Sequence, residues 1–327
     1  MKSIIIEQND AEQRLDKFLK KLFVNASMSL IYKLNRKWNI KINKKKKPND
    51  YKLQVGEEMK IFVPDDEYKK LTKSQKTREV QSQSLSKNDI IFEDKHIIAI
   101  NKEAWVLVHP WDFQSSDVSL IYQVQDYLWK WANSLTFSPA LVHRIDKDTS
   151  GIILIAKQKQ ALSALVSDFK MHTNICKTYT ALVFWKLSRH SGTIQKKLVR
   201  LEKAHNQNKI QVSDSWQTAI SHYTLKKQYF FDTWRERIAV SEVEVTIDTG
   251  RMHQIRVHMA HIWNPIVWDS TYGDKFLNSY VSKTFWVQRQ FLHARKLEFQ
   301  HPVTHKKKEL IAPLKQDMQS FMQKLSR

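Results

Sequence analysis

The sequence contains one cysteine, Cys176, and no apolar run long enough to span a membrane. A single thiol excludes an internal disulfide and a cysteine metal cluster, and such usage is typical of a cytoplasmic protein. The longest apolar runs fall far short of the roughly 18 residues that a spanning helix needs. The apolar part of residues 1–7, MKSIIIE, is too short for a signal peptide. We therefore expect a cytoplasmic protein without a membrane anchor.

Glycine is scarce and tryptophan is abundant. The chain has 5 glycines among 327 residues, whereas a typical usage of about 7% would give about 23. It has 11 tryptophans. Trp263 precedes Asn264 and Pro265 at the exit of an expected helix, where a left-handed residue is favoured. Trp38 stands where a turn should open a strand at 40–42. Large indoles thus occupy positions at which the backbone favours glycine.

Acidic residues are greatly outnumbered by basic ones. The chain has 54 Lys and Arg against 33 Asp and Glu, which gives a formal net charge of +21. This excess indicates a polyanionic partner, either nucleic acid or an acidic membrane surface. The length allows one large domain or two, with ample core for stability.

Residues 1–64 are predicted to form a small α+β domain. Apolar positions at helical spacing come first, and Ser27 is the expected N-cap of a second helix. Short strands are predicted near 40–42 and 59–63. Between them lie four consecutive lysines at 44–47, a pattern that is usually a solvated face.

Residues 65–88 are rich in Lys, Gln, Ser and Thr, with little apolar content, and a flexible linker is predicted there. Over residues 89–327, short β-rich runs such as 97–100 alternate with helical patterns. The last pattern, at 315–327, predicts a terminal amphipathic helix. This alternation predicts an α+β domain on a mostly antiparallel sheet.

The most informative stretch is 142–151, VHRIDKDTSG, which runs into the apolar segment IILIA. The pattern predicts a polar loop that leads into a buried strand. Asp146 lies between Arg144 and Lys147, and a carboxylate flanked by cations is a candidate nucleophile because its charge is retained. On the residues alone, an ordinary solvated turn is an equally good interpretation.

Two further segments carry side chains with chemical potential. The strand-like segment KTYTALV at 177–183 places Tyr179 on one face, where a core aromatic is the simpler interpretation. Residues 249–261, TGRMHQIRVHMAH, contain three histidines. No carboxylate recurs beside them at ligand spacing, so no metal site is expected.

These segments resemble the motifs of the RluA/RluC-type pseudouridine synthases. That family reads His-Arg-Leu-Asp-x-x-Thr-Ser-Gly before an apolar strand and Ala-Lys, as at 143–157 here. It also reads Lys-x-Tyr-x-Ala, as at 177–181, and Thr-Gly-Arg-Thr-His-Gln-Leu-Arg-Val-His, as at 249–258, where Met252 is a minor departure. The resemblance covers nearly the whole chain.

The N-terminal domain resembles the small RNA-binding domain shared by a ribosomal small-subunit protein and tyrosyl-tRNA synthetases. The matching residues are RLDKFL at 14–19, a Ser-x-Ser helix start and the turn at 56–58. This resemblance implies a helix and a loop that contact phosphates. The RNA-binding residues expected there are Arg14, Lys17, Lys33, Arg36, Lys44, Lys45, Lys46 and Lys47.

The family resemblance implies an α+β pseudouridine synthase catalytic domain with a mostly antiparallel mixed sheet, which isomerises uridine to pseudouridine in RNA. Asp146 would be the nucleophile or catalytic carboxylate, Arg256 its partner in an ion pair, and Tyr179 a group that stacks on the base and serves proton transfer. The base must be flipped out to reach the carboxylate, and Arg144 would fill the gap. The other RNA-contacting residues expected are His143, Arg251 and His253.

No cofactor and no metal are implied, and a monomer acting on large-subunit ribosomal RNA is expected. Two alternatives remain open. One is a non-catalytic RNA-binding protein or ribosome assembly factor on the same scaffold, against which the intact Asp146, Tyr179 and Arg256 argue. The other is a pseudouridine synthase that acts on transfer RNA.

The family pattern has glycine or a small turn residue at several positions where this chain has tryptophan. These positions are Trp38, Trp105, Trp111, Trp185, Trp216, Trp263 and Trp268. Independent mutations would scatter among Ala, Ser and Asn, whereas the substitute here is always tryptophan. We therefore hypothesise that the gene comes from a lineage that reads UGA as glycine, and that the sequence is a translation in which UGA is read as tryptophan.

Overall fold

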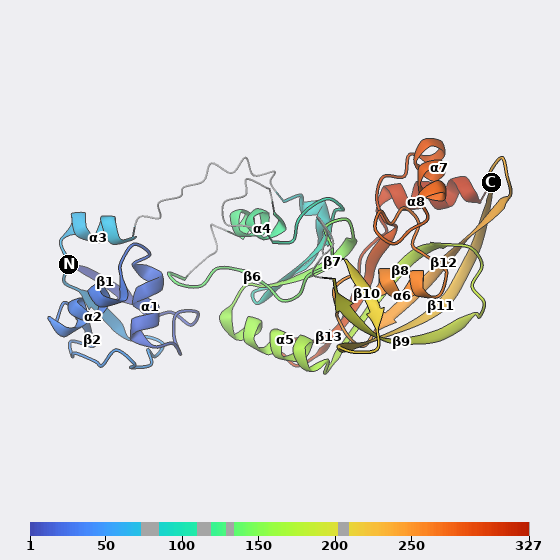
Figure 1. Ribbon diagram of the computed structural model, residues 1–327. Coiled ribbons are helices and arrows are strands. Elements are labelled where there is room, and N and C mark those ends of the chain that lie inside the picture. Colours follow the sequence, from blue (N-terminus) through green and yellow to red (C-terminus); the bar gives the residue numbers. More distant parts are fainter. Residues whose placement is uncertain (73–84, 110–118, 129–133, 202–208, 327) are drawn as a thin grey trace. The chain divides into compact units, whose positions relative to one another are not determined.

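The structure is a computed structural model that describes residues 1–72, 85–109, 119–128, 134–201 and 209–326. It contains two compact units, whose elements are labelled in Figure 1. The first unit comprises residues 1–84, 122–139 and 157–160, and the second comprises residues 85–121, 140–156 and 161–327.

Residues 1–72 of the first unit form a three-stranded antiparallel sheet and three helices. The strands follow the order β1 (Lys2–Ile5), β3 (Glu58–Ile61) and β2 (Ile40–Ile42). Helices α1 (Leu15–Leu22) and α2 (Met28–Arg36) bury their apolar faces in the core of this unit. Ser27 caps α2 as predicted, because its hydroxyl accepts the Leu30 N–H at 3.2 Å.

The linker predicted at 65–88 begins with a helix instead of irregular chain. Helix α3 (Asp65–Thr72) has acidic residues in its first turn and lysines in its last, which suits the helix dipole. Leu71 joins the buried core of the first unit, and Tyr68 packs edge to face on Phe23. Two apolar residues three positions apart are too weak a pattern to reveal a helix in a polar segment. Residues 73–84 of the predicted linker lie outside the described residues.

The first unit also takes in two segments from later in the chain. Buried Asp10 accepts hydrogen bonds from the backbone N–H groups of Leu135 and Thr136, at 3.1 and 3.0 Å. It also accepts hydrogen bonds from the hydroxyls of Ser134 and Thr136, at 2.8 and 2.6 Å. The boundaries expected at 64 and 89 came from composition, which cannot reveal bonds between residues so far apart in the sequence.

The second unit is built on an eleven-stranded mixed sheet of order β10-β9-β11-β12-β8-β13-β7-β5-β4, with β14 paired to β13 and β6 to β7. All these neighbours are antiparallel except β13 and β7. The strands are β4 (Ile90–Glu93), β5 (Ile97–Lys102), β6 (Ala140–Leu141), β7 (Ser150–Ala156), β8 (Ile175–Phe184), β9 (Ser191–Arg200), β10 (Ile210–Ser213), β11 (Gln217–Asp232), β12 (Arg237–Ile247), β13 (Leu292–Gln300) and β14 (Lys307–Ile311). The predicted α+β class with a mostly antiparallel sheet is confirmed.

Helices pack on this sheet through separate apolar clusters. Ala161 and Leu165 of α5 (Lys159–Met171) join a cluster with Leu154 of β7. Helices α7 (Lys275–Phe285) and α8 (Gln316–Leu325) lie side by side in Figure 1 and share a second cluster with β8 and β12. The remaining helices are η1 (Lys87–Asp89), α4 (Leu120–Leu128) and α6 (Gln254–His261). None of the helices in the described ranges is long and apolar enough to cross a membrane.

The parallel contact of β7 with β13 depends on Gly151, the last residue of the 142–151 motif. Gly151 has φ +111° and pairs with Ala294. A Cβ at this position would lie 2.3 Å from the Ala294 carbonyl oxygen. Only glycine therefore permits the two strands to approach so closely behind the loop that carries Asp146.

The described tryptophans, with one exception, occupy left-handed backbone. Their φ values are 65° at Trp38, 70° at Trp105, 67° at Trp185, 105° at Trp216, 64° at Trp263, 60° at Trp268 and 62° at Trp286. The exception is Trp234. All the positions that the sequence had marked as glycine-like have positive φ, apart from Trp111, which lies outside the described residues. Trp286 had not been recognised.

Three of these tryptophans end helices. Trp38 and Trp263 follow the C-cap residues of α2 and α6, and Trp286 is itself the C-cap of α7. After α2, the Asn39 N–H donates to the Leu34 carbonyl at 3.1 Å, and after α6 the Asn264 N–H donates to the Met259 carbonyl at 2.9 Å. Both are Schellman arrangements, whereas α7 ends in the simpler αL cap, in which the Trp286 N–H donates to the Ser282 carbonyl at 3.1 Å. Glycine normally occupies the left-handed position of both motifs. An indole at such a position gains nothing from the backbone geometry and adds strain.

Candidate active site

Asp146 lies in the loop between β6 and β7, and its side chain is 27% exposed. Its Oδ2 atom accepts a hydrogen bond from Arg256 Nη1 at 3.0 Å. The loop turns tightly, because the Thr149 N–H donates to the Asp146 carbonyl at 3.2 Å. The carboxylate therefore faces a guanidinium on one side and remains accessible on the other.

Arg256 is held rigidly from helix α6. Its Nε and Nη2 donate to the two carboxylate oxygens of Asp269, at 2.7 and 2.9 Å, and Nη2 also reaches the Thr271 hydroxyl at 3.2 Å. Burial opposes the charge of the guanidinium, but the hydrogen bonds and charges of Asp269 and Asp146 raise the pKa of Arg256. A bidentate anchor of this kind fixes the direction of the one N–H that points to Asp146.

Tyr179 projects from β8 into the same site. It is buried, and both burial and the negative charge of Asp146 raise the pKa of its phenol. Its hydroxyl therefore keeps its proton at neutral pH, and its ring forms an apolar wall beside the carboxylate. The three residues predicted to be catalytic thus line one small cavity of about 80 Å³.

Several RNA-contacting residues predicted from the motifs also line this cavity. Arg144 and Arg251 are exposed at its edge, and His253 lies inside it. His143, in contrast, has an internal role. Its Nε2 accepts the Leu154 N–H at 3.1 Å, its ring stacks on Phe169, and burial lowers its pKa to about 3. These contacts tie the ring to β7 and α5, and its contact with RNA stays a prediction.

Lys102 supports the Asp146 loop from beneath. This almost completely buried ammonium donates to the carbonyl oxygens of Glu103, Val106 and Lys147, at 2.7, 2.9 and 2.8 Å. Its three N–H donors are therefore matched by three acceptors, although burial lowers its pKa to about 7. One lysine thereby joins the turn after β5 to the residue next to Asp146.

The sequence had assigned no role to Asp269, Tyr272 or Lys102. Asp269 and Tyr272 lie on the loop between α6 and α7, which also presents Gly273. A Cβ at Gly273 would lie 2.4 Å from the Asp269 carbonyl oxygen, so the loop needs glycine there. The pattern of Asp, Tyr and Gly within five residues is visible in the sequence, but nothing in it shows which side chains the loop contacts. Among the described residues, no group of three or more His, Cys, Asp and Glu side chains could hold a metal ion.

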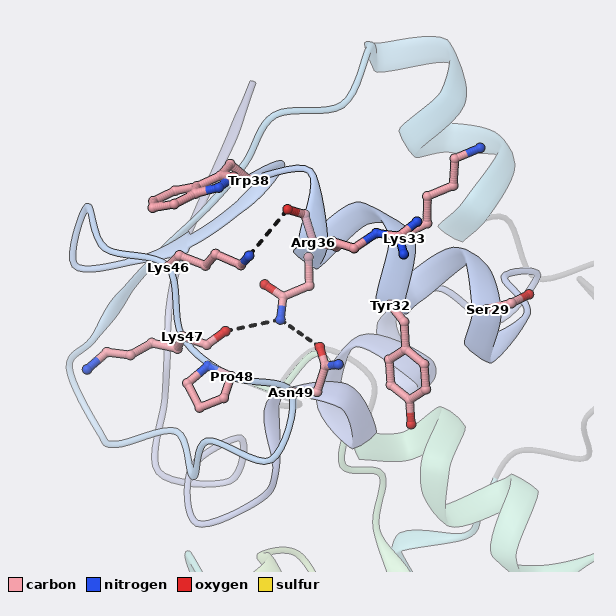
Figure 2. A pocket seen from close by; sticks show the side chains of 10 residues that line it. Ser29, Tyr32, Lys33, Arg36, Trp38, Lys46, Lys47, Pro48 and Asn49 are labelled. Carbon is pink, nitrogen blue, oxygen red and sulfur yellow. Dashed lines mark hydrogen bonds between the residues drawn. The ribbon is translucent and has the colours of Figure 1, made fainter.

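A second concave surface lies on the first unit, between α2 and the loop at 44–49 (Figure 2). Its volume is about 950 Å³. Buried Asn35 ties the loop to the helix by donating to the Lys47 carbonyl at 3.1 Å and to the Asn49 side chain at 2.6 Å. The residues that line it are Ser29, Tyr32, Lys33, Asn35, Arg36, Trp38, Lys46, Lys47, Pro48 and Asn49.

This surface brings together half of the basic residues predicted to bind RNA on the first unit. Lys33, Arg36, Lys46 and Lys47 line it. Arg14, Lys17, Lys44 and Lys45 do not. Arg14 forms a bidentate pair with Asp16 instead, at 3.1 and 2.8 Å. Lys17, Lys44 and Lys45 are exposed.

Comparison with known proteins gives consistent results. Residues 96–261 match the family model described as RNA pseudouridylate synthase. The chain is 34% identical over 313 residues to the ribosomal large subunit pseudouridine synthase C of Buchnera aphidicola subsp. Schizaphis graminum, covering 95% of this chain and 93% of that protein. The Escherichia coli K12 protein of the same name is 29% identical over 326 residues, covering 99% of this chain and 97% of that protein.

A solved structure has a similar fold. The human RNA Pseudouridylate Synthase Domain Containing 4 matches with a TM-score of 0.57 and 20% sequence identity, covering 73% of this chain and 93% of that chain. At this level of identity the likeness concerns the arrangement of helices and strands alone.

Proposed function

Because the chain belongs to the RNA pseudouridylate synthase family, we propose that it converts specific uridines to pseudouridine in large-subunit ribosomal RNA, with Asp146 as its catalytic carboxylate. The enzyme is an RNA pseudouridine synthase. The substrate is supported by the near full-length similarity to ribosomal large subunit pseudouridine synthases of several bacteria.

The observation that carries the catalytic proposal is the convergence of Asp146, Arg256 and Tyr179 on one cavity. The reaction breaks the bond between the sugar C1′ and the uracil N1, turns the base and joins C1′ to C5. C5 then loses a proton and N1 gains one, so the product is an isomer of uridine. A carboxylate can assist as nucleophile or as electrostatic support for the sugar. Arg256 stabilises its negative charge at 3.0 Å, and the Tyr179 ring offers a flat surface for the turning base.

Access of the nucleotide to Asp146 requires that it leave its stack. Arg144 is exposed at the edge of the cavity, two residues before Asp146. A guanidinium is planar and can stack on bases or bind phosphates. We assign to Arg144 the space that the flipped nucleotide vacates.

The first unit would bind the phosphate backbone of the RNA. Lys33, Arg36, Lys46 and Lys47 surround a concave surface with Tyr32 beside them. Four cations around an open surface suit a phosphate backbone, and no metal is needed for the attraction. This unit supplies affinity, whereas the cavity at Asp146 supplies the chemistry.

One experiment tests this proposal together with its two alternatives, a transfer RNA substrate and a non-catalytic assembly factor. We would map pseudouridines in ribosomal and transfer RNA from cells that carry the gene, lack it, or carry the Asp146→Asn version. Loss of pseudouridine from large-subunit RNA in the second and third strains supports the proposal. Loss confined to transfer RNA would favour that substrate. Unchanged maps together with a defect in ribosome assembly would favour a non-catalytic assembly factor.

A further inference from the structure

His253 has one ring nitrogen bound to the protein and one directed into the cavity. It lies at the N-terminus of α6 with φ 54°. Its Nδ1 is 2.9 Å from the Tyr272 hydroxyl, and its Nε2 is 3.9 Å from Asp146 Oδ2. The second distance is too long for a hydrogen bond, and the Asp146 oxygen already accepts from Arg256. The imidazole side chain is 18% exposed, on the side of the cavity.

The Tyr272 hydroxyl determines which tautomer His253 adopts. The Ile210 N–H donates to this hydroxyl at 2.8 Å, so the phenol oxygen already acts as an acceptor. Burial raises the pKa of Tyr272 to about 12, so the phenol keeps its proton. Within the described residues the only other partner of this hydroxyl is His253 Nδ1. The phenol therefore donates to Nδ1, and a neutral imidazole must carry its own proton on Nε2.

Burial favours the neutral form of the His253 ring. Burial lowers its pKa, Arg256 and Arg144 lower it further, and the carboxylates of Asp146 and Asp269 act in the opposite direction. Among the described residues Nε2 has no hydrogen-bond partner within the protein. A neutral N–H donor without a protein partner is thus held beside the catalytic carboxylate.

We propose that His253 is a further catalytic residue, which donates its Nε2–H to a carbonyl oxygen of the target uracil, and that Tyr272 is the positioning residue that fixes this tautomer. The inference rests on the proposed reaction at Asp146. When the bond between C1′ and N1 breaks, its electron pair passes to the uracil ring and is delocalised onto the carbonyl oxygens. A hydrogen bond to such an oxygen becomes stronger as the charge develops, so it lowers the barrier. The imidazole keeps its proton throughout.

A single loop then organises both neighbours of Asp146. Asp269 anchors Arg256 by two hydrogen bonds, and Tyr272, three residues later, orients His253. The Tyr272 ring also lies against the Arg256 guanidinium, 5.2 Å from ring centroid to Cζ. The Tyr272 N–H is itself held by Asp269 at 3.0 Å.

The kinetic test compares His253→Asn with His253→Gln. Asparagine tolerates positive φ but places its amide near the Nδ1 position, so it removes the donor to the substrate. Glutamine can extend an amide N–H to the Nε2 position. We expect kcat to fall roughly 10- to 100-fold in His253→Asn with little change in KM, because the lost bond acts in the transition state, and to recover in part in His253→Gln. Equal kcat in wild type and His253→Asn would overturn the proposal.

The tautomer can be tested in the wild-type enzyme, independently of any variant's folding. Long-range proton–nitrogen NMR of the histidine-labelled protein should show Nδ1 as the unprotonated nitrogen of His253. In Tyr272→Phe the two tautomers should mix and kcat should fall. Tyr280→Phe, which removes a surface hydroxyl bound to the Asp232 carbonyl at 2.7 Å, is the matched control and should change neither. A proton on Nδ1 of the wild type would contradict the inference.

The activities of Asp146→Asn and His253→Asn distinguish a failure of this inference from a failure of the proposed function. If Asp146→Asn is inactive while His253→Asn has normal kcat, the reaction stands and the role of His253 falls. If Asp146→Asn retains wild-type turnover, the proposed site itself is wrong.

Discussion

Glycine at three exposed tryptophan positions is expected to stabilise the second unit. Trp263, Trp286 and Trp216 are 84%, 77% and 70% exposed and have φ of 64°, 62° and 105°. Their indoles therefore contribute little packing, while their backbone is in the left-handed region. Trp185 and Trp268 are left unchanged in this experiment, because both pack on the apolar cluster beneath α7 and α8 and glycine would remove that contact.

The magnitude follows from two opposing effects. A side chain in left-handed backbone costs about 1–2 kcal/mol. Glycine gives the unfolded chain more freedom, which costs about 0.4–1 kcal/mol. The net gain is about 0.5–1 kcal/mol at each position, or about 1.5–3 kcal/mol for the triple glycine variant, if the three sites are independent. For a unit of this size, such a gain corresponds to a rise in Tm of about 3–12 °C.

The assay is thermal unfolding of four purified proteins (wild type, the triple glycine variant and two controls), followed by far-UV circular dichroism. The triple alanine variant removes the same three indoles but keeps a Cβ at each position, so it should remain near wild type. Trp234→Gly is a second control, since Trp234 is 73% exposed but is not among the residues with positive φ. Glycine there should destabilise. A triple glycine variant no more stable than the triple alanine variant would refute the reasoning.

The gene provides the corresponding test of the decoding hypothesis. If UGA is read as glycine, the codons at Trp38, Trp105, Trp111, Trp185, Trp216, Trp263 and Trp268, and also at Trp286, should be UGA. UGG codons at these positions would end the hypothesis and leave the tryptophans in need of another explanation.

Three further outcomes are expected. Lys46→Gln with Lys47→Gln should weaken RNA binding and reduce its logarithmic salt slope by about 0.7–0.9 for each lost phosphate contact; an unchanged slope would remove the loop from the interface. Burial lowers the pKa of His258 to about 4 and that of His293 to about 3, so the folded state resists protonation of both imidazoles. The unfolding free energy should therefore fall by at most about 1.4 kcal/mol per pH unit for each histidine as the pH drops from about 6.5 to 4. Urea unfolding midpoints that stay constant over this pH range would contradict the prediction. Asp269→Asn, which breaks a buried ion pair, should lower the unfolding free energy by about 3–5 kcal/mol, and a loss below 1 kcal/mol would show that its arginine partner finds another anchor.

Local motifs pointed to Asp146, Tyr179 and Arg256, which line one cavity, whereas the residues that support them could not be predicted from the sequence. The 142–151 motif, with its turn and apolar strand, marked Asp146, and the left-handed helix exit at Trp263 followed from helix-end rules. Asp269 and Tyr272 gave no such signal, because their roles depend on a loop that returns to α6 only in the folded chain. Helix α3 was missed for a similar reason: its tertiary contacts, not its local pattern, stabilise it.

The same reasoning explains the residues that moved from one role to another. Arg14 and His143 were assigned to RNA because the motifs containing them bind RNA. In the structure, a carboxylate two residues away engages Arg14, and a strand N–H and an aromatic ring engage His143. Sequence motifs mark where a function is, but the contacts within the fold decide which side chains remain available for it.

The most direct test of the central claim is single-turnover pseudouridine formation by wild-type enzyme and Asp146→Asn, on large-subunit ribosomal RNA from cells lacking the gene. The substitution removes a charge with little change in shape, so RNA affinity should stay within a few-fold. We predict that wild type forms pseudouridine at defined positions and that Asp146→Asn forms none. Substantial turnover by the purified variant would contradict the assignment of Asp146.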